Sequence, residues 1–248
     1  DLLEKVTLKE GDIYNELKSR VDERAVRDHY LSKGYANSRI TSEAIVNDDS
    51  SITLAFNIVE GKQTVISAIE FEGNRVMATK TLRGAMKLKE AKLFSSGTFS
   101  EAQLEADKTA IASYYNERGY IDAVIENVLR ETDTESDPEK NLLKLTFVIR
   151  EGEQYTYGGT KIEGNHVFST ETLMEKIRLE EGDVMNLNKF NVGYQTLLDV
   201  YFENGYTANY IRKQENRDQE RKIVTYTIIV VESDRSHIEN IIIRGNTK

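Results

Sequence analysis

The chain has 248 residues, enough for two ordinary domains or three small ones, and its 30% charged and 39% hydrophobic residues are typical of a folded protein with modest cores. Its net charge of -9 argues against nucleic acid as a partner, because phosphate binding requires a basic surface and no cluster of lysine and arginine stands out. The lack of cysteine excludes disulfides, thiolate chemistry and zinc sites built on cysteine.

From the N-terminus onward, a helical stretch ends in a Tyr-x-x-x-Gly-Tyr block, and this block occurs three times. The blocks are residues 30–35, 115–120 and 201–206, so their glycines are separated by 85 and 86 residues. Apolar residues stand eight and four positions before each glycine, on one helical face: Val26 and Tyr30, Ile111 and Tyr115, Leu197 and Tyr201. The glycine is expected to end the helix in the left-handed conformation.

Two strands are predicted after each block. An isoleucine six residues beyond the glycine lies in the first of them: Ile40, Ile125 or Ile211. The second alternates strictly over four positions: Ile52, Leu54, Phe56, Ile58; Leu143, Leu145, Phe147, Ile149; Val224, Tyr226, Ile228, Val230. This period of two predicts a strand with one buried face.

The next segment predicts a strand and a short helix. The strand ends at a Gly-Asn turn, with Ile66, Ile69 and Phe71, or Ile238, Ile241 and Ile243, expected to face inward. The helix is predicted at about residues 170–179, capped by Ser169 or Thr170. Gly182 and its equivalents Gly11 and Gly97 are expected to end it.

Each repeat therefore reads strand, helix, helix, strand, strand. This order predicts an α+β fold of three-stranded mixed sheets, each covered by two helices. We predict a partial repeat without its first strand at residues 1–62, complete repeats at 63–153 and 154–234, and the first strand of a further repeat at 235–248. Because the chain opens at Asp1, without Met, we expect a piece of a longer protein.

Other side-chain sets do not predict chemistry. The residues His29, His166 and His237 occupy different phases of the repeat, which argues against a shared metal. The acidic stretch 131–139 lacks the glycine and terminal glutamate of a calcium loop, so a solvated hairpin tip is favoured. The tyrosine columns have the helical spacing of core residues rather than of platforms for bases or glycans. No catalytic set emerges, so neither enzyme activity nor a cofactor is expected.

Three short motifs carry a family resemblance. The segment EGEQY at 151–155, leading into KIEGN at 161–165, and YYNERGY at 114–120 resemble POTRA domains of BamA-type outer-membrane protein assembly factors. The resemblance covers essentially the whole chain, and aligns it with part of the second repeat, the third, the fourth and the start of the fifth. Six extra residues around 88–96 and the acidic hairpin depart from the pattern, and are expected to affect where a partner binds.

The resemblance implies a periplasmic region of an outer-membrane protein from a diderm bacterium, monomeric as a fragment. Its implied partners are unfolded outer-membrane proteins, accessory periplasmic lipoproteins and a membrane barrel downstream in the parent chain. The expected function is a polypeptide-binding scaffold that receives unfolded outer-membrane proteins by β-strand augmentation and docks accessory subunits. The alternatives are the periplasmic arm of a related secretion or translocation porin, and a structural spacer or division module without substrate binding.

In the family the second strand of each repeat lies at a sheet edge, where unpaired amides and carbonyls can capture an extended peptide. Here these strands are expected at about 36–46, 121–130 and 207–214. We predict the peptide-binding edge in the most apolar of them: Ala123, Val124, Ile125, Glu126, Asn127 and Val128. The competing interpretation is that charged residues merely protect these edges, namely Arg39, Glu126, Arg130, Arg212 and Lys213.

Overall fold

The computed structural model describes residues 2–93 and 95–245, which form two compact units. Unit one contains the described residues up to Ile111 together with Val124–Arg150. Unit two contains Ala112–Ala123 and the described residues from Glu151 onward. Among the residues described, no helix has the length and apolar character needed to span a bilayer.

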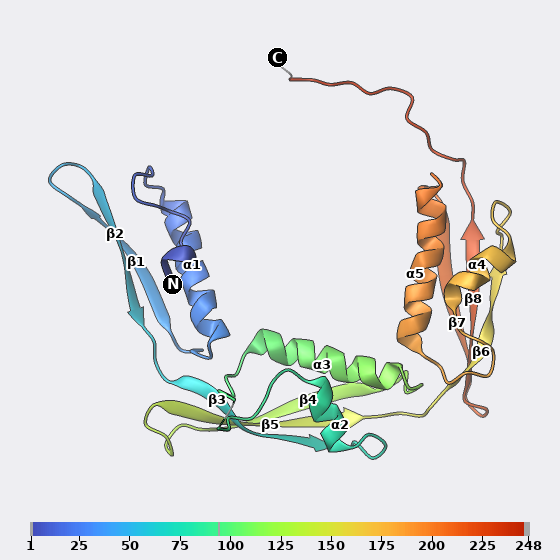
Figure 1. Ribbon diagram of the computed structural model, residues 1–248, viewed down its shortest axis with the longest axis horizontal. Helices are drawn as coiled ribbons and strands as arrows, with labels where there is room; N and C mark the ends of the chain where they lie inside the picture. The colour runs from blue at the N-terminus through green and yellow to red at the C-terminus, as the bar shows by residue number, and fades with distance from the viewer. Residues whose placement is uncertain (1, 94, 246–248) are drawn as a thin grey trace. The chain divides into compact units, whose positions relative to one another are not determined.

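Unit one opens with an incomplete repeat. It consists of η1 (Leu2–Glu4), α1 (Glu16–Ser32) and an antiparallel hairpin of β1 (Arg39–Val46) and β2 (Ile52–Val59) (Figure 1). A small core forms around Val6, Val26 and Ile40. The alternating side chains of β2 remain partly exposed, because the described part of the chain gives this repeat a sheet of two strands and pairs no further strand with β2.

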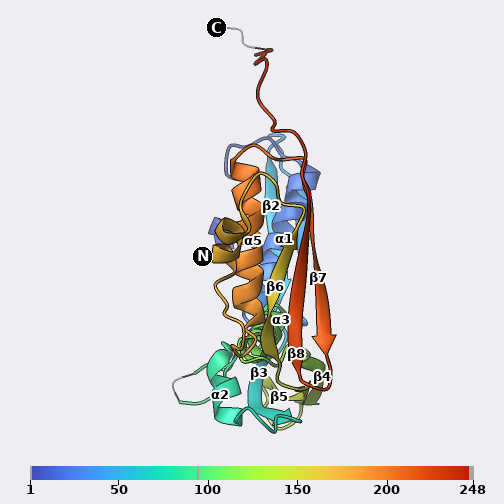
Figure 2. The same cartoon turned by 90° about the vertical axis from the view of Figure 1, so that its right-hand side faces the viewer.

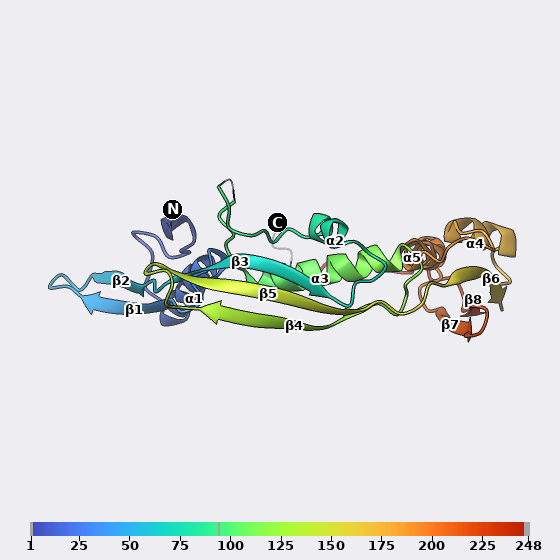
Figure 3. The ribbon, with the colours of Figure 1, turned by 90° about the horizontal axis from the view of Figure 1, so that it is seen from below.

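Unit one also holds the sheet of the first complete repeat (Figure 3). Its elements are β3 (Gln63–Glu72), α2 (Thr79–Ala85), α3 (Glu101–Asn116), β4 (Val124–Asp133) and β5 (Lys140–Arg150). The third strand, β5, is central: β3 pairs with it in parallel and β4 antiparallel. The predicted inward residues of β5 are at most 4% exposed, so the central strand supplies the core face.

Unit two repeats this arrangement with β6 (Thr156–Glu163), α4 (Thr170–Ile177), α5 (Leu187–Glu203), β7 (Tyr210–Asp218) and β8 (Ile223–Val231). The strand order is β6-β8-β7, with both helices on one face (Figure 2). Phe190 of α5 stacks on Tyr226 of β8 at 3.8 Å between ring centroids. The predicted α+β fold of tandem strand-helix-helix-strand-strand repeats is confirmed.

The prediction that Gly97 and Gly182 end the short helices is wrong. Helix α4 is capped by Ser169 as expected, but it ends at Ile177, with Arg178 in the left-handed conformation at φ 54°. Gly182 lies further along, where its N–H donates to the Tyr157 carbonyl at 2.8 Å. These glycines turn the connection back onto the first strand of the sheet, which a helix-capping pattern cannot reveal.

A tyrosine–glutamate hydrogen bond closes each repeat. The tyrosine four residues before the repeat glycine donates to a glutamate just beyond the last strand: Tyr30 to Glu60 at 2.9 Å, Tyr115 to Glu151 at 2.7 Å and Tyr201 to Glu232 at 2.9 Å. Burial, followed by the bond to Glu232, raises the pKa of Tyr201. Each tyrosine therefore stays protonated and remains a donor at neutral pH.

A second bond links each repeat to the segment that follows it. The carbonyl of the repeat glycine accepts an N–H from the start of the next repeat: Thr64 to Gly34 at 2.8 Å, Tyr155 to Gly119 at 2.9 Å and Ser236 to Gly205 at 2.8 Å. We call this main-chain bond, together with the tyrosine–glutamate bond, the joint. At the first joint, the Lys62 ammonium also donates to the carbonyls of Thr134 and Asp137 in the acidic hairpin tip.

The described residues after the last joint do not form a strand. The isoleucines predicted to face inward, Ile238, Ile241 and Ile243, are 77–78% exposed. In both complete repeats the first strand pairs with the third strand of its own repeat. No third strand follows Ser236 among the described residues, so these side chains have no sheet of their own repeat to pack against there.

The glycine of the Gly-Asn turn should tolerate no side chain. A Cβ at Gly164 would lie 2.1 Å from the Val230 carbonyl oxygen, at φ +82°, whereas a Cβ at Gly182, at φ +98°, would meet nothing within 4 Å. We expect Gly164→Ala to lower the free energy of unfolding by about 3 kcal/mol or more, and Gly182→Ala by about 1 kcal/mol. Urea denaturation of both variants measures this, and equal losses would contradict the predicted clash.

Removing the joint hydroxyl should cost stability in a pH-dependent way. Burial acts to raise the pKa of Glu232, but N–H groups of Val167 and His166 and the Tyr201 hydroxyl lower it below its ordinary 4.5. A lowered pKa means that the stabilisation is present above about pH 4.5 and is lost as the pH falls. We therefore expect Tyr201→Phe to cost about 1.5 kcal/mol at neutral pH and less in acid.

Urea denaturation at several pH values measures this loss. The control is Tyr210→Phe, at a tyrosine that is 62% exposed, and it should change stability by less than about 0.5 kcal/mol. A loss for Tyr201→Phe that is independent of pH would show that the carboxylate does not carry the effect.

Candidate peptide-binding edge

The predicted peptide-binding residues lie on an outer strand of their sheet. Figure 3 shows β5 between β3 and β4, in keeping with the order β3-β5-β4. Residues Val124 to Val128 form the first half of β4, but Ala123 does not belong to the strand, because its N–H donates to the Tyr120 carbonyl in the preceding turn. The strand also begins three residues later than predicted, since this turn occupies residues 121–123.

A bulge shapes this part of β4. The pairing with β5 shifts between Ile125 and Asn127, so that Glu126 is the additional residue. Ile125 and Val128 are half-buried, while Val124 and Leu129 are 37% and 44% exposed. The bulge interrupts the alternation of a regular strand, and it increases the local twist.

The charged residues of β4 bind within their own repeat. Arg130 makes two hydrogen bonds to the Glu101 carboxylate of α3, at 2.9 and 2.6 Å. This pairing raises the pKa of Arg130. Glu126 accepts from Arg150 of the neighbouring strand at 2.7 Å. Both charged side chains therefore bind neighbouring residues of the same repeat. They protect the strand edge less than two free surface charges would.

The helix side chain eleven residues before the repeat glycine distinguishes the three edges. In the first repeat it is Glu23, which accepts the N–H of Ser42 in β1 at 3.2 Å. In the last repeat it is Tyr194, whose hydroxyl donates to the Ile211 carbonyl in β7 at 3.2 Å. In the middle repeat it is Lys108, which instead pairs with Glu105 of its own helix at 3.0 Å. Thus α1 and α5 bind the backbone of their edge strands.

The backbone of β4 has no such contact from α3 in the part of the chain that the structure describes. The Val128 N–H donates instead to its neighbour's side chain, Asn127 Oδ1, at 2.8 Å. Asn127 is exposed and can turn away without disturbing the sheet. Of the three edge strands, β4 is therefore the one whose backbone binds no helix side chain within the described residues.

The edge strand β7 is more polar and better covered. Its sequence, YIRKQENRD, contrasts with VIENVLRETD of β4. Lys213 bends back over the Tyr194 ring, 5.0 Å from its centroid, and binds Asn191 Oδ1. Burial lowers the pKa of Lys213. Of the predicted protecting charges, Lys213 therefore covers its own helix rather than projecting into solvent.

At the opposite edge of each complete sheet, the connection between the helices binds the first strand, a contact that no sequence pattern indicated. In the first, the Ala91 N–H donates to the Ile66 carbonyl and the Ile66 N–H donates to Gly97, both at 2.7 Å. In the second, Tyr157 donates to Asp183 at 2.8 Å and Met185 donates to Tyr155 at 2.9 Å. The connection between the two helices therefore binds the beginning of the first strand in each sheet, whereas the second strand lies at the other edge.

Metal-binding geometry is not found in the described ranges 2–93 and 95–245, where no three histidine, aspartate or glutamate side chains cluster suitably. The acidic hairpin tip holds the Lys62 ammonium on its carbonyls. Asp133 accepts hydrogen bonds from Ser136 and Glu135, and these bonds lower its pKa to about 2. The tip is therefore organised by its own hydrogen bonds.

Comparison with known proteins agrees with this geometry. The family described as POTRA, surface antigen variable number repeat, matches residues 1–61, 64–152 and 155–233. A Treponema pallidum protein named "Putative outer membrane protein assembly factor" is 50% identical over 250 residues, covering 100% of the chain and 30% of that protein. The outer membrane protein assembly factor BamA of Nitratidesulfovibrio vulgaris is 23% identical over 257 residues, covering 100% of the chain and 32% of that protein.

Among solved structures, the crystal structure of Haemophilus influenzae BamA POTRA3-5 has a TM-score of 0.52 at 22% identity, covering 92% of this chain and 89% of the other. That similarity concerns the fold. The chain spans about a third of the length of the two curated relatives. With a family match over nearly its whole length and a relative that is 50% identical, the chain belongs to the POTRA family and consists of non-catalytic POTRA repeats of a BamA-type outer membrane protein assembly factor.

Proposed function

We propose that these repeats are the periplasmic polypeptide-binding scaffold of an outer-membrane β-barrel assembly factor, and that β4 receives unfolded outer-membrane proteins by β-strand augmentation. One observation carries the proposal: β4 is an apolar edge strand whose backbone α3 leaves unbound, while side chains of α1 and α5 bind the backbones of β1 and β7. The names of the relatives supply the class of process, outer membrane protein assembly.

The chemistry of strand addition fits a substrate of variable sequence. An incoming strand would pair with the outward N–H and carbonyl groups from Val124 to Val128, displacing Asn127 from the Val128 N–H. Main-chain pairing reads an extended shape rather than a sequence. The exposed side chains of Val124 and Leu129 would add a weak preference for apolar residues.

The chain would consist of successive repeats within a longer parent protein. We propose repeat boundaries at residues 1–62, 63–153 and 154–234, followed by the first strand of a further repeat at 235–248, and this division agrees with the positions of the joints. A membrane barrel elsewhere in the parent chain would insert the substrate, and accessory lipoproteins would dock on other surfaces of the repeats.

Blocking one N–H of β4 should abolish strand addition. We expect Val128→Pro to weaken binding of a synthetic peptide with alternating valine and threonine by at least about tenfold, because proline removes the N–H that now binds Asn127. The matched control is Lys213→Pro: Lys213 pairs with Ile228 of the other sheet as Val128 pairs with Phe147. Fluorescence anisotropy measures binding, and circular dichroism verifies folding.

Cross-linking locates the bound peptide independently. The chain has no cysteine, so a photoreactive group can be attached uniquely at Leu129→Cys or Arg212→Cys. The peptide should cross-link at the first position and weakly at the second. Equal cross-linking at both, or equal loss of affinity in the two proline variants, would reject β4 as the binding edge.

The joint distinguishes a binding scaffold from a spacer. Inserting Gly-Ser between Gly61 and Lys62 would lengthen the connection from β2 to β3 and so weaken the main-chain bond from Thr64 to Gly34 that spans it. In the full-length parent protein we expect this insertion to lower the amount of assembled outer-membrane barrels severalfold. The same insertion in the exposed turn at residues 48–50 is the control. Normal assembly with both insertions would favour the spacer.

A further inference from the structure

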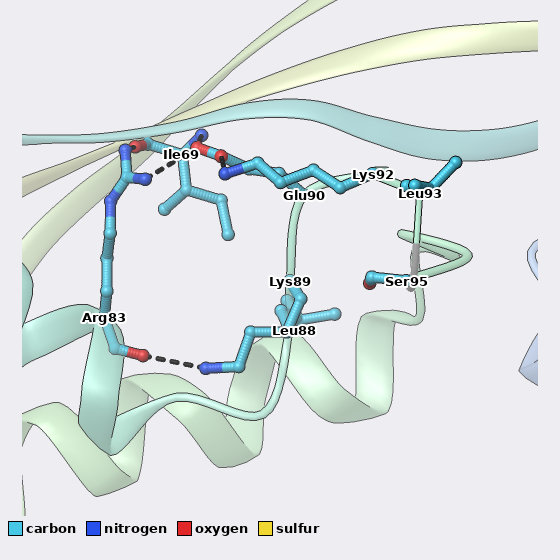
Figure 4. Close-up of a pocket in the computed structure, with 8 residues that line it drawn as sticks. All are labelled: Ile69, Arg83, Leu88, Lys89, Glu90, Lys92, Leu93 and Ser95. Carbon is cyan, nitrogen blue, oxygen red and sulfur yellow. Dashed lines mark hydrogen bonds and ion pairs between the residues drawn. The ribbon is translucent and has the colours of Figure 1, made fainter.

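A pocket of about 450 Å³ lies at the outer side of β3, away from the candidate edge β4 (Figure 4). Described residues of the connection between α2 and α3, among them Leu88, Leu93 and Ser95, line one wall. In sequence this connection, residues 86–100, is six residues longer than the connection between α4 and α5, residues 178–186. Asp107 fixes the start of this wall by accepting the N–H groups of Lys87 and Leu88, both at 2.8 Å. The start of the connection is therefore held on α3.

The backbone of Ile69, where β3 borders the pocket, is already satisfied. Glu90 accepts the Ile69 N–H at 3.1 Å, and the Arg83 guanidinium donates to the Ile69 carbonyl. Arg83 and Glu90 also pair with each other at 2.8 Å, as the dashed lines in Figure 4 show. These two side chains occupy the groups that an added strand would need. A ligand of this pocket must therefore bind through its side chains, unlike a ligand of β4.

The interior of the pocket is apolar. Ile69 and Leu88, which are 3% and 4% exposed, line it from within. Leu93 stands at the mouth and is 90% exposed. A concave apolar surface with an uncovered leucine at its rim is suited to hold one apolar side chain of a partner.

The rim is cationic in a chain whose net charge is -9. Between residues 80 and 92 there are five cationic side chains and one acidic side chain, Glu90. Arg83 and Lys92 both pair with Glu90 at 2.8 Å, so this trio retains a positive charge. Lys89 adds a second positive charge. Two of its three N–H groups bind the carbonyls of Arg83 and Met86, and these neutral acceptors leave its charge uncompensated.

We propose that this pocket is a docking site for an acidic polypeptide segment of a partner protein. One apolar side chain of the segment would insert between Ile69, Leu88 and Leu93. Carboxylates beside it would pair with Lys89 and Lys92, of which Lys92 is 70% exposed. Opposite charge at the rim and apolar contact in the interior together define this occupant, and neither alone would give specificity.

The test uses the 248-residue chain and a fluorescein-labelled synthetic peptide, Glu-Leu-Asp-Phe-Glu. Two further peptides separate charge from apolar contact: Lys-Leu-Lys-Phe-Lys and Glu-Ser-Asp-Ser-Glu. We expect only the first to bind measurably by fluorescence anisotropy, and its affinity to fall as salt rises from about 0.05 M to about 0.5 M, because exposed ion pairs are screened.

Two variants test the residues. Combining Lys89→Glu with Lys92→Glu should weaken binding by about tenfold or more. Leu93→Ser should weaken peptide binding by about fivefold. This variant keeps every charge, and the side chain that it changes is too exposed to support the fold. The matched control combines Lys18→Glu with Lys189→Glu, which changes net charge equally at exposed positions in the first turns of α1 and α5. It should stay within about twofold of the unmodified chain.

Three results would overturn the proposal. The first is equal binding of the peptide to the pocket variants and to the lysine control. The second is equal binding of Glu-Leu-Asp-Phe-Glu and Glu-Ser-Asp-Ser-Glu. The third is absence of peptide binding while vesicles of phosphatidylcholine and phosphatidylglycerol bind through Lys89 and Lys92, which would identify a lipid surface instead. Val128→Pro should leave peptide binding here unchanged, so failure of this site and failure of the β4 edge are distinguishable.

Discussion

Every three-stranded sheet has two edges, and the main-chain groups on each edge must find partners or face water. Both complete repeats meet this constraint in the same way. The third strand is central, the connection between the helices covers the first strand, and the second strand stays at the open edge. The repeats differ in whether a side chain of the long helix binds the backbone of that edge strand. The Glu23 carboxylate and the Tyr194 hydroxyl bind the edge backbone in two repeats. In the third, Lys108 binds Glu105 of its own helix instead.

The periodic features of the fold could be predicted from the sequence. The alternation from Leu143 to Ile149 and from Val224 to Val230 identified the buried central strands, because a period of two matches the geometry of a strand. The repeat glycines marked the ends of the long helices, and Gly34, Gly119 and Gly205 have φ of 85–87°. Such patterns depend on local geometry, which each segment of sequence encodes by itself.

The features that depend on contacts between distant segments could not be predicted in this way. Gly182 is repeated with the correct period, but its role is to return the connection to Tyr157, and Arg178 ends the helix instead. The bulge at Glu126 and the turn that leaves Ala123 outside β4 also depend on such contacts. The cationic rim was missed because its side chains are spread along thirteen residues, and the fold gathers several of them around one pocket.

The joint has an evolutionary consequence. The bond from one repeat to the next joins a main-chain N–H to a main-chain carbonyl, and three different residues, Thr64, Tyr155 and Ser236, supply the N–H. A duplicated gene segment could therefore attach to its neighbour without first acquiring a matched pair of side chains. The donor side of this bond is indifferent to residue identity, while the acceptor side is a glycine that each repeat carries, which suits a family described as a variable number repeat.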